Sequence, residues 1–330
     1  MNATTPAAPL RKLTIALTGG LLFALHSSGA TAQGYPARPV RVVNVAAGSL
    51  ADTVTRLTFA HVSEALGQQF IIDSRPGAGG NISAAIVAKS PADGYTLYLV
   101  VQNVMTVNPF LYAKPGFDPL RDFETISMVA KISEVLIVHP SLGVKSLTAF
   151  VRLAQARPGQ VNYASAGNGH PTHLMMELLQ RKAAIRLEHV PYKTTPQAVL
   201  GVIGGEVGVL NIAIGLVRPH IANGKLVALA KTGYPSPDAL PDIPALTASY
   251  PDAEYVPYLA TFAPKGVPGD ILARLNVAIG RALAAPEIVS RLRELDLTAA
   301  PSSPAELEKT IRADMAVNRE LVKSIGLKLD

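Results

Sequence analysis

Cysteine and tryptophan are absent from this 330-residue sequence, and aromatic residues make up only 5% of it. Without cysteine, the chain can have no disulfide scaffold, no thiolate metal cluster and no cysteine nucleophile. Charged residues are sparse as well, at 16%, and the net charge of +6 comes from Lys and Arg scattered along the chain. Nucleic-acid-binding proteins concentrate their basic residues in runs or stripes. We therefore expect no nucleic-acid partner.

The N-terminus has the pattern of an export signal. Arg11 and Lys12 precede an uncharged stretch, residues 13–25, and small residues follow as far as Ala32. A basic start, a short apolar stretch and an A-x-A site are typical of a Sec-type signal peptide. The stretch is shorter than the roughly 20 apolar residues that span a bilayer, although an uncleaved anchor is the alternative. We expect residues 1–32 to be removed, leaving Gln33 first in a protein exported to the periplasm.

The whole sequence is 48% apolar, and the part after residue 32 alternates short β-branched runs with amphipathic stretches. Strands are predicted at 40–45, 70–72 and 96–101, with helices at 51–66 and 82–89 between them. A second series starts near Val135 and alternates in the same way to residue 230. This order is typical of parallel, doubly wound sheets. A proline-rich loop (233–257), a strand (258–263) and two helices close the chain, the second helix beginning with a capping box at Ser303 and Glu306. We expect two α/β lobes with a ligand cleft between them.

Two turns between a strand and a helix are the strongest functional signals. Residues 46–52 (AAGSLAD) precede the first helix, and residues 165–172 (SAGNGHPT) hold the equivalent place in the second series. Small residues let a ligand approach the backbone, and a helix N-terminus offers free N–H groups to an anion such as a carboxylate. The alternative is that these residues only satisfy turn geometry and capping, with Asp52 as a first-turn acid.

Residues for catalysis or metal binding are poorly represented. His170 and His173 are three residues apart, so a metal pair is an alternative to a loop histidine beside a helix-start histidine. The sequence has no HExxH motif, no G-x-S-x-G elbow and no evident pair of carboxylates. We expect a protein that is not an enzyme and needs no metal and no cofactor.

Several short motifs, in order, resemble the extracytoplasmic solute receptors of the tripartite tricarboxylate transporter system, known as the Bug family. The motifs that carry the resemblance are residues 35–41 (YPARPVR), 75–81 (RPGAGGN), 91–97 (PADGYTL), 117–123 (FDPLRDF), 189–193 (HVPYK), 240–244 (LPDIP) and 263–264 (AP) ahead of Pro268. The resemblance implies an α/β, type II periplasmic-binding-protein fold, with two doubly wound lobes joined by crossing strands. Lobe one would comprise residues 33–137 and 258–330, and lobe two residues 138–257.

The resemblance also implies a small carboxylate-bearing solute, held by backbone amides and small polar side chains. The positions that match the family's site are Gly48, Ser49, Asp52, Gln102, Asn103, Ser165, Gly167, Asn168, Gly169, Thr172, His173 and, more weakly, Asn211 after a strand of lobe two. The chain departs from the family pattern at residues 46–49, 102–105, Thr194, Gly208 and Tyr258.

The resemblance favours a periplasmic receptor that delivers an organic acid to the membrane components of a tripartite transporter. Two alternatives remain: a sensor that docks on a sensor kinase, and a periplasmic enzyme on the same scaffold.

Overall fold

The computed structural model describes residues 1–4, 34–236, 239–253, 255–326 and 328–330. The chain divides into two compact units, residues 1–37 and 38–330. The predicted signal peptide lies outside the described residues except for residues 1–4, and the described part of the first unit forms no helix or strand. Every element below belongs to the second unit.

The first half of the sheet is built as the periodicity predicts. Its elements are β1 (Val40–Asn44), α1 (Leu50–Leu66), β2 (Phe70–Ser74), α2 (Asn81–Ala88) and β3 (Thr96–Val101). β1 pairs in parallel with β2 on one side and β3 on the other. Two short helices that were not predicted, α3 (Asn103–Thr106) and α4 (Asn108–Leu111), follow β3.

A single long strand, β4 (Phe123–Val138), connects the two halves of the sheet. Its first part pairs with β9 (Tyr258–Pro264) and β10 (Leu297–Ala299), and its last part pairs with β7 and β8. The prediction that this strand starts near Val135 was wrong, because the strand starts at Phe123. Polar residues such as Ser127, Ser133 and Glu134 interrupt its apolar run, although all three are buried.

The second half of the sheet also follows the predicted alternation. Its elements are α5 (Leu147–Ala156), β5 (Asn162–Ser165), α6 (Pro171–Ala183), β6 (Glu188–Pro191), α7 (Thr195–Ile203), β7 (Val209–Ala213), α8 (Ile214–Ala222) and β8 (Val227–Gly233). β5 pairs in parallel with β6 and β7, whereas β7 and β8 run antiparallel to β4.

The C-terminal region returns to the first half of the sheet. β9 lies between β3 and β4, and α9 (Gly269–Ala284), α10 (Pro286–Glu294) and α11 (Pro304–Ile325) follow it. The prediction of two closing helices was wrong, since there are three, with β10 between the last two. A single residue, Ala285, separates α9 from α10, and α10 begins with Pro286. Proline is common in the first turn of a helix, but a proline that follows a helical pattern predicts the end of that helix. The sequence therefore did not indicate that a second helix begins at Pro286.

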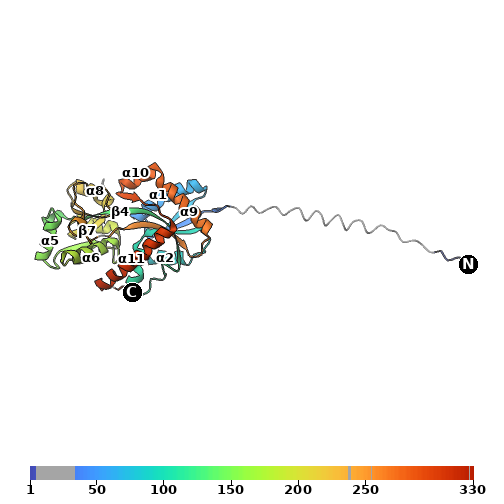
Figure 1. The fold of residues 1–330 in the computed structure, drawn as a ribbon, viewed down its shortest axis with the longest axis horizontal. Helices are drawn as coiled ribbons and strands as arrows, with labels where there is room; N and C mark the ends of the chain where they lie inside the picture. The colour runs from blue at the N-terminus through green and yellow to red at the C-terminus, as the bar shows by residue number, and fades with distance from the viewer. Residues whose placement is uncertain (5–33, 237–238, 254, 327) are drawn as a thin grey trace. The chain divides into compact units, whose positions relative to one another are not determined.

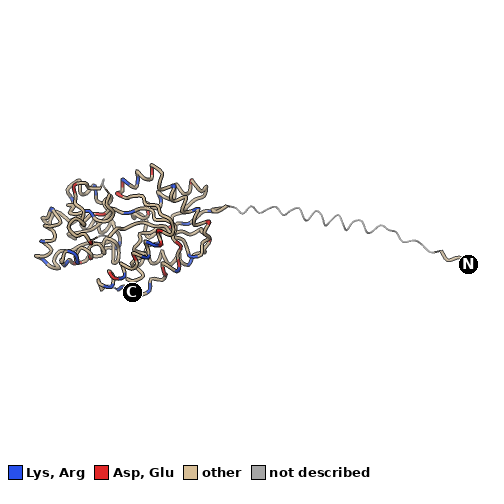
Figure 2. The backbone as a smooth tube through the Cα atoms, viewed as in Figure 1, with Lys and Arg blue, Asp and Glu red and all other residues tan. Residues whose placement is uncertain are grey.

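Helices cover both faces of this sheet. Figure 1 shows β4 in the middle of the second unit, with α8 and α10 on one side and α6 and α11 on the other. The core has separate clusters: one around Tyr98 and Phe262 in the first half, and two around Phe150 and Leu210 on opposite faces of the second half. Figure 2 shows acidic and basic residues interspersed along the folded chain, in agreement with the scattered charge of the sequence. Among the described residues, no helix is long and apolar enough to cross a membrane.

Candidate functional site

The predicted site loops follow the carboxyl ends of strands in each half of the sheet. Ser49 follows β1 and Gln102 follows β3 in the first half, and the 166–170 loop follows β5 in the second. In open α/β sheets, ligands bind outside the carboxyl ends of the strands. The two halves meet here, because Asn103 Nδ2 lies 3.5 Å from the Gly169 carbonyl oxygen. Val107, Leu111, Leu174 and Val322 form an apolar cluster beside this contact.

Gly169 shows how close this contact is. A Cβ added at Gly169 would lie 2.3 Å from Leu111 Cδ2, and the residue has a φ of +73°. Only glycine adopts this conformation at little cost, and only glycine leaves room for Leu111. The loop before α6 is therefore packed directly against α4.

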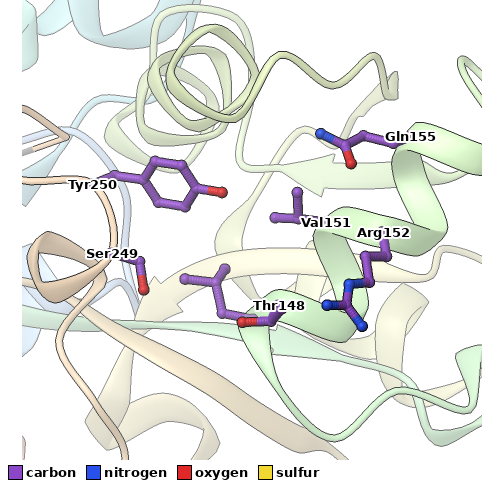
Figure 3. A pocket seen from close by; sticks show the side chains of 7 residues that line it. Thr148, Val151, Arg152, Gln155, Ser249 and Tyr250 are labelled. Carbon is purple, nitrogen blue, oxygen red and sulfur yellow. The ribbon is translucent and has the colours of Figure 1, made fainter.

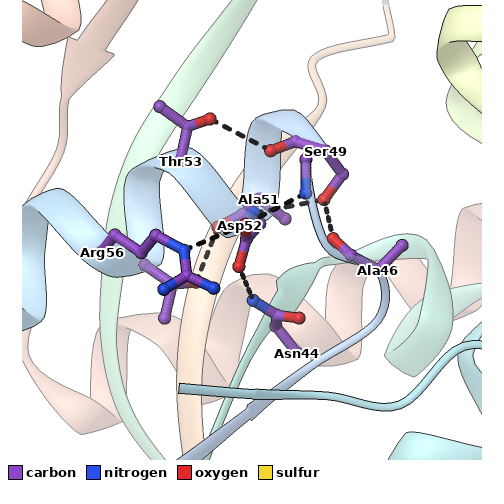
Figure 4. A network of polar contacts seen from close by, with 9 residues as sticks. Asn44, Ala46, Ser49, Ala51, Asp52, Thr53 and Arg56 are labelled. Atoms are coloured by element: carbon purple, nitrogen blue, oxygen red, sulfur yellow. Dashed lines mark hydrogen bonds and ion pairs between the residues drawn. The ribbon is translucent and has the colours of Figure 1, made fainter. Parts of the chain in front are cut away.

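The turn before α1 is held by its own polar side chains (Figure 4). Ser49 is the N-cap: its hydroxyl accepts a hydrogen bond from the Asp52 amide at 3.1 Å and donates to the Ala46 carbonyl at 2.7 Å. The Asp52 carboxylate accepts from Gly48 N at 3.0 Å, Asn44 Nδ2 at 2.8 Å and Arg56 Nε at 3.1 Å. Burial opposes ionisation of Asp52, but the hydrogen bonds from Arg56, Gly48 and Asn44 outweigh it and lower the pKa of Asp52.

This turn still offers donors to a ligand. The N–H groups of Leu50 and Ala51, in the first turn of α1, have no hydrogen-bond partner in the described part of the chain. A Cβ placed on Gly48 would meet nothing within 4 Å, so the space beside the turn is open. Helix α1 has 17 residues, and the partial positive charge at its N-terminus attracts anions.

The loop before α6 is closed by hydrogen bonds from side chains to its backbone. Ser165 Oγ accepts from Gly167 N at 3.1 Å, Thr172 Oγ1 accepts from Ala166 N at 3.0 Å, and His173 Nδ1 accepts from Gly169 N at 3.2 Å. Ser165 and Thr172 are fully buried, and His173 is 3% exposed. Three predicted ligand-binding side chains thus maintain the loop conformation.

Asn168 is the exception in this loop. Its side chain is half-buried, and neither this side chain nor its backbone N–H has a partner among the described residues. No Lys or Arg lies in 48–52 or 165–173. The amides of Leu50 and Ala51, together with Asn168, are thus neutral donors left for a ligand in these two loops.

Below the 165–173 loop, three aromatic rings stack. The His173 and His189 ring centroids are 4.1 Å apart, and those of His189 and Tyr163 are 4.8 Å apart. Burial lowers the pKa of His170, His173 and His189 to about 4 each, so all three are neutral at pH 7. Within the described residues, no group of three His, Asp or Glu side chains is arranged to hold a metal ion.

Ser165 and His189 have the spacing of a nucleophile and its base, with Oγ 2.6 Å from Nε2. A catalytic pair of this kind needs a serine that substrate can reach and a third group that orients the base. Ser165 is fully buried, and within the described chain no carboxylate is hydrogen-bonded to the His189 ring. This pair therefore gives no support for an enzyme.

Gln102 and Asn211 make internal hydrogen bonds. Gln102 Oε1 accepts from the Tyr258 amide at 3.0 Å, and its Nε2 lies 3.4 Å from the Tyr255 hydroxyl. The prediction that Asn211 follows its strand was wrong, because Asn211 lies within β7 and is fully buried. Its Nδ2 donates to Glu134 Oε2 at 2.6 Å, and its Oδ1 accepts from the Thr232 hydroxyl at 2.7 Å.

Glu134 was missed by the sequence reasoning. It is 3% exposed, and burial raises its pKa to about 7 despite the hydrogen bond from Asn211. The available signal was an acid directly preceding the apolar run Val135–Val138, because carboxylates are rarely buried without a partner.

A separate hollow of about 210 Å³ lies between α5 and the segment at Ser249 and Tyr250. Figure 3 shows Arg152 and Gln155 projecting from α5 on one side of it. None of the predicted site residues lines this hollow.

Residues 54–327 match the model of the TctC family, the tripartite tricarboxylate transporter family receptors. The chain belongs to this family. Among its relatives, BugT of Bordetella pertussis is 32% identical over 302 residues, which cover 91% of this chain and 93% of BugT. The resemblance to Bug-family receptors is thus confirmed.

Solved structures agree with this assignment. Rpa4515 of R. palustris, solved with adipate, has a TM-score of 0.84 at 29% identity, covering 90% of this chain and 100% of that one. MatC from Rhodopseudomonas palustris, with bound malate, has a TM-score of 0.79 at 28% identity, covering 87% of this chain and 100% of that one. The periplasmic binding protein BugD has a TM-score of 0.81 at 27% identity, covering 90% of this chain and 100% of that one. The predicted periplasmic-binding-protein fold is confirmed, and this TctC-family receptor is a periplasmic protein.

Proposed function

We propose that the protein captures a small organic acid between two lobes and delivers it to the membrane components of a tripartite transporter. Lobe one comprises residues 33–137 and 258–330, and lobe two residues 138–257. Membership of the TctC family supports this, as do the relatives solved with adipate and with malate. Removal of residues 1–32 by signal peptidase belongs to the same proposal.

One observation carries this proposal: the open turn before α1. The Leu50 and Ala51 amides have no partner in the described chain, and no side chain fills the space beside Gly48. Neutral donors at a helix N-terminus bind a carboxylate without a fixed cation. Asn168 supplies a donor from the other lobe, in a loop that packs against α4 through Gly169.

The receptor is proposed to be neither an enzyme nor a sensor. Ser165 of the nucleophile-like pair Ser165–His189 is fully buried, and the Asp52 carboxylate already accepts hydrogen bonds from Asn44, Gly48 and Arg56. No feature of the described residues favours docking on a sensor kinase over delivery to a transporter.

Binding is tested by thermal shift of the mature protein against malate, adipate, succinate and benzoate, followed by calorimetric titration of each acid that raises the melting temperature. A carboxylate with micromolar affinity is the expected result. The mass of the ligand is then measured after hours of incubation with the purified protein. An unchanged mass indicates a receptor, whereas a changed mass indicates an enzyme. The absence of binding by any of these acids, with the protein folded, contradicts capture of a small carboxylate of these classes.

An acid that contacts both lobes stabilises the closed state of the receptor. We expect small-angle scattering to give a smaller radius of gyration at saturation than without the acid. An unchanged profile at saturation contradicts closure but leaves binding intact.

A further inference from the structure

Glu134 lies in the last part of β4, where this strand pairs with β7 and β8 of the second half of the sheet. Along β4 it pairs with Ala213, the last residue of β7, and with Thr232 of β8. Successive side chains of a strand alternate between faces, so Glu134 shares a face with Leu136 and Val138. Those two residues pack in the cluster that includes Met175 and Met176 of α6. Glu134 therefore lies at the carboxyl end of β7, on the face of the sheet covered by α6.

One carboxylate oxygen of Glu134 is fixed in place. Asn211 Nδ2 donates to Oε2 at 2.6 Å, and the Thr232 hydroxyl in turn fixes the Asn211 amide, donating to its Oδ1 at 2.7 Å. This chain of hydrogen bonds holds the Glu134 carboxyl group in place.

The other oxygen, Oε1, has no hydrogen-bond partner in the described chain, and no described Lys, Arg or His forms an ion pair with Glu134. Oε1 is not among the fully enclosed polar atoms that lack a partner, so a small accessible surface remains at this otherwise buried side chain. Buried polar groups in native proteins are almost always paired. The Glu134 side chain is only 3% exposed and has one unpaired oxygen, so Oε1 is available to form a hydrogen bond with a ligand.

The charged and titratable groups around Glu134 do not neutralise it. The pKa of Tyr255, in the segment before β9, is raised by burial and also by the charges of Glu134 and of Asp314 in α11. His173 of α6 is neutral, with its pKa lowered to about 4 by burial. On β4 itself, Lys131 lies over the Tyr234 ring, and the neighbouring Ser133 amide donates to the Asp296 carbonyl. Asp296 forms an ion pair with Arg218 of α8. Among the described side chains, the Asn211 amide is thus the group that is hydrogen-bonded to Glu134.

We propose that Glu134 is a ligand-binding residue that carries a proton on Oε1 and donates it in a hydrogen bond to a carboxylate oxygen of the captured acid. This inference rests on the proposed function, and it assigns the site a preference for acids bound together with one proton. Two ionised carboxylates cannot lie in contact inside a protein without a cation between them. A shared proton replaces this repulsion by a short, charge-assisted hydrogen bond.

Binding and protonation are then linked. Burial already raises the pKa of Glu134 to about 7 without a ligand, and a second carboxylate beside it raises the pKa further. The affinity for the acid therefore falls as the pH rises through 7, by about tenfold between pH 6 and pH 8. At pH 8 each binding event takes up close to one proton, because about 90% of the free receptor has lost it.

The test uses the acid of the malate, adipate, succinate and benzoate panel that stabilises the mature protein most. It is titrated by calorimetry at pH 6, 7 and 8, each in two buffers with different ionisation enthalpies. We expect the tenfold fall in affinity and an uptake of about 0.9 proton at pH 8.

Two variants identify Glu134 as the source of the linkage. E134Q keeps an oxygen for Asn211 and places an N–H donor where the proton would be, so it is expected to bind with the low-pH affinity of the wild type at every pH. E134L has a similar volume but no donor, and it is expected to bind about tenfold more weakly at pH 6. Unfolding curves of both variants at pH 6 establish that they are folded.

Each alternative result is informative. A wild-type affinity that does not change with pH, or that changes equally in E134Q, overturns the inference and leaves carboxylate capture standing. An affinity that rises with pH, with a proton released, also overturns it, because Glu134 would then be ionised opposite a donor of the ligand. If no acid of the panel binds the folded wild type, the proposed function itself fails.

Discussion

Asn211 and Glu134 are hydrogen-bonded across neighbouring strands, with Nδ2 of Asn211 2.6 Å from Oε2 of Glu134. Seventy-seven positions separate them in the sequence, and both side chains are buried: Asn211 in the middle of β7, and Glu134 opposite Ala213, the last residue of β7. Asn211, which was predicted to contact the ligand, thus donates a hydrogen bond to Glu134, which was not a predicted site residue. Its expected role becomes the positioning of Glu134.

Replacing Asn211 should therefore reduce stability. Asn211→Ala removes the donor to Glu134 and the acceptor of Thr232, leaving two buried polar groups unpaired, and is expected to lower the free energy of unfolding by about 2–4 kcal/mol. Urea unfolding at pH 7 measures the change. Thr232→Val is the partial control, because it breaks only the hydrogen bond between Thr232 and Asn211. A loss of stability as large as that of Asn211→Ala would contradict the role of the Asn211–Glu134 hydrogen bond.

Ser165 and Asn168 lie in the same loop and should respond in opposite ways. Ser165 is buried and bonds the Gly167 amide, so Ser165→Ala is expected to lower the free energy of unfolding by about 1–3 kcal/mol. Asn168 has no partner in the described chain, so Asn168→Ala should leave the melting temperature unchanged and weaken acid binding about tenfold. Thermal unfolding and calorimetry of both variants check this. Wild-type affinity in Asn168→Ala would exclude its side chain from the site.

Alanine at Gly169 and at Gly48 gives a matched pair of variants that tests the packing of the loop before α6 against α4. Their φ angles are +73° and +70°, so alanine at either position has similar backbone strain, about 1–2 kcal/mol. Only at Gly169 does the new methyl group meet Leu111, at 2.3 Å. We expect Gly169→Ala to be clearly less stable than Gly48→Ala in urea unfolding. Equal losses would mean that α4 and the loop do not pack as described.

The pH dependence of stability tests the burial of Glu134 without any ligand. Its folded-state pKa is raised to about 7 from an ordinary 4.5, so the stability that its protonated form contributes is complete below pH 4.5 and is lost as the pH rises through 7. E134Q has no such loss. Relative to the wild type, it should gain stability between pH 5 and pH 8, by up to about 3 kcal/mol. Urea unfolding of both proteins at pH 5 and pH 8 measures this gain. If the difference in free energy of unfolding between E134Q and the wild type is equal at the two pH values, Glu134 is not desolvated.

The first residue of the secreted protein tests the export signal. Expression of the full chain in a Gram-negative host, followed by mass spectrometry of the periplasmic fraction, should give a chain that begins at Gln33. A periplasmic or membrane-bound product that retains residues 1–32 would indicate the uncleaved anchor instead. A start elsewhere near residue 33 would move the cleavage site but keep the signal.

The sequence by itself determined most of the elements of the two α/β halves, the returning strand β9 and the capping box of α11. These features depend on periodicity and capping, which act over a few residues and can be read locally. The sequence also located the two turns, at Gly48 and Gly167, because glycine at a strand end is a local signal. It did not reveal the full length of β4, where buried Ser127, Ser133 and Glu134 break the apolar run.

Only the tertiary structure decided which polar groups remain free for a ligand. The sequence could not show that Ser165, Thr172 and His173 close their own loop, or that Asp52 is held by Asn44, Gly48 and Arg56. Nor could it show that Glu134 has one oxygen bound by Asn211 and one unpaired. Hydrogen-bond partners are set by strand pairing and loop packing between distant segments, and no local pattern of residue types encodes that register.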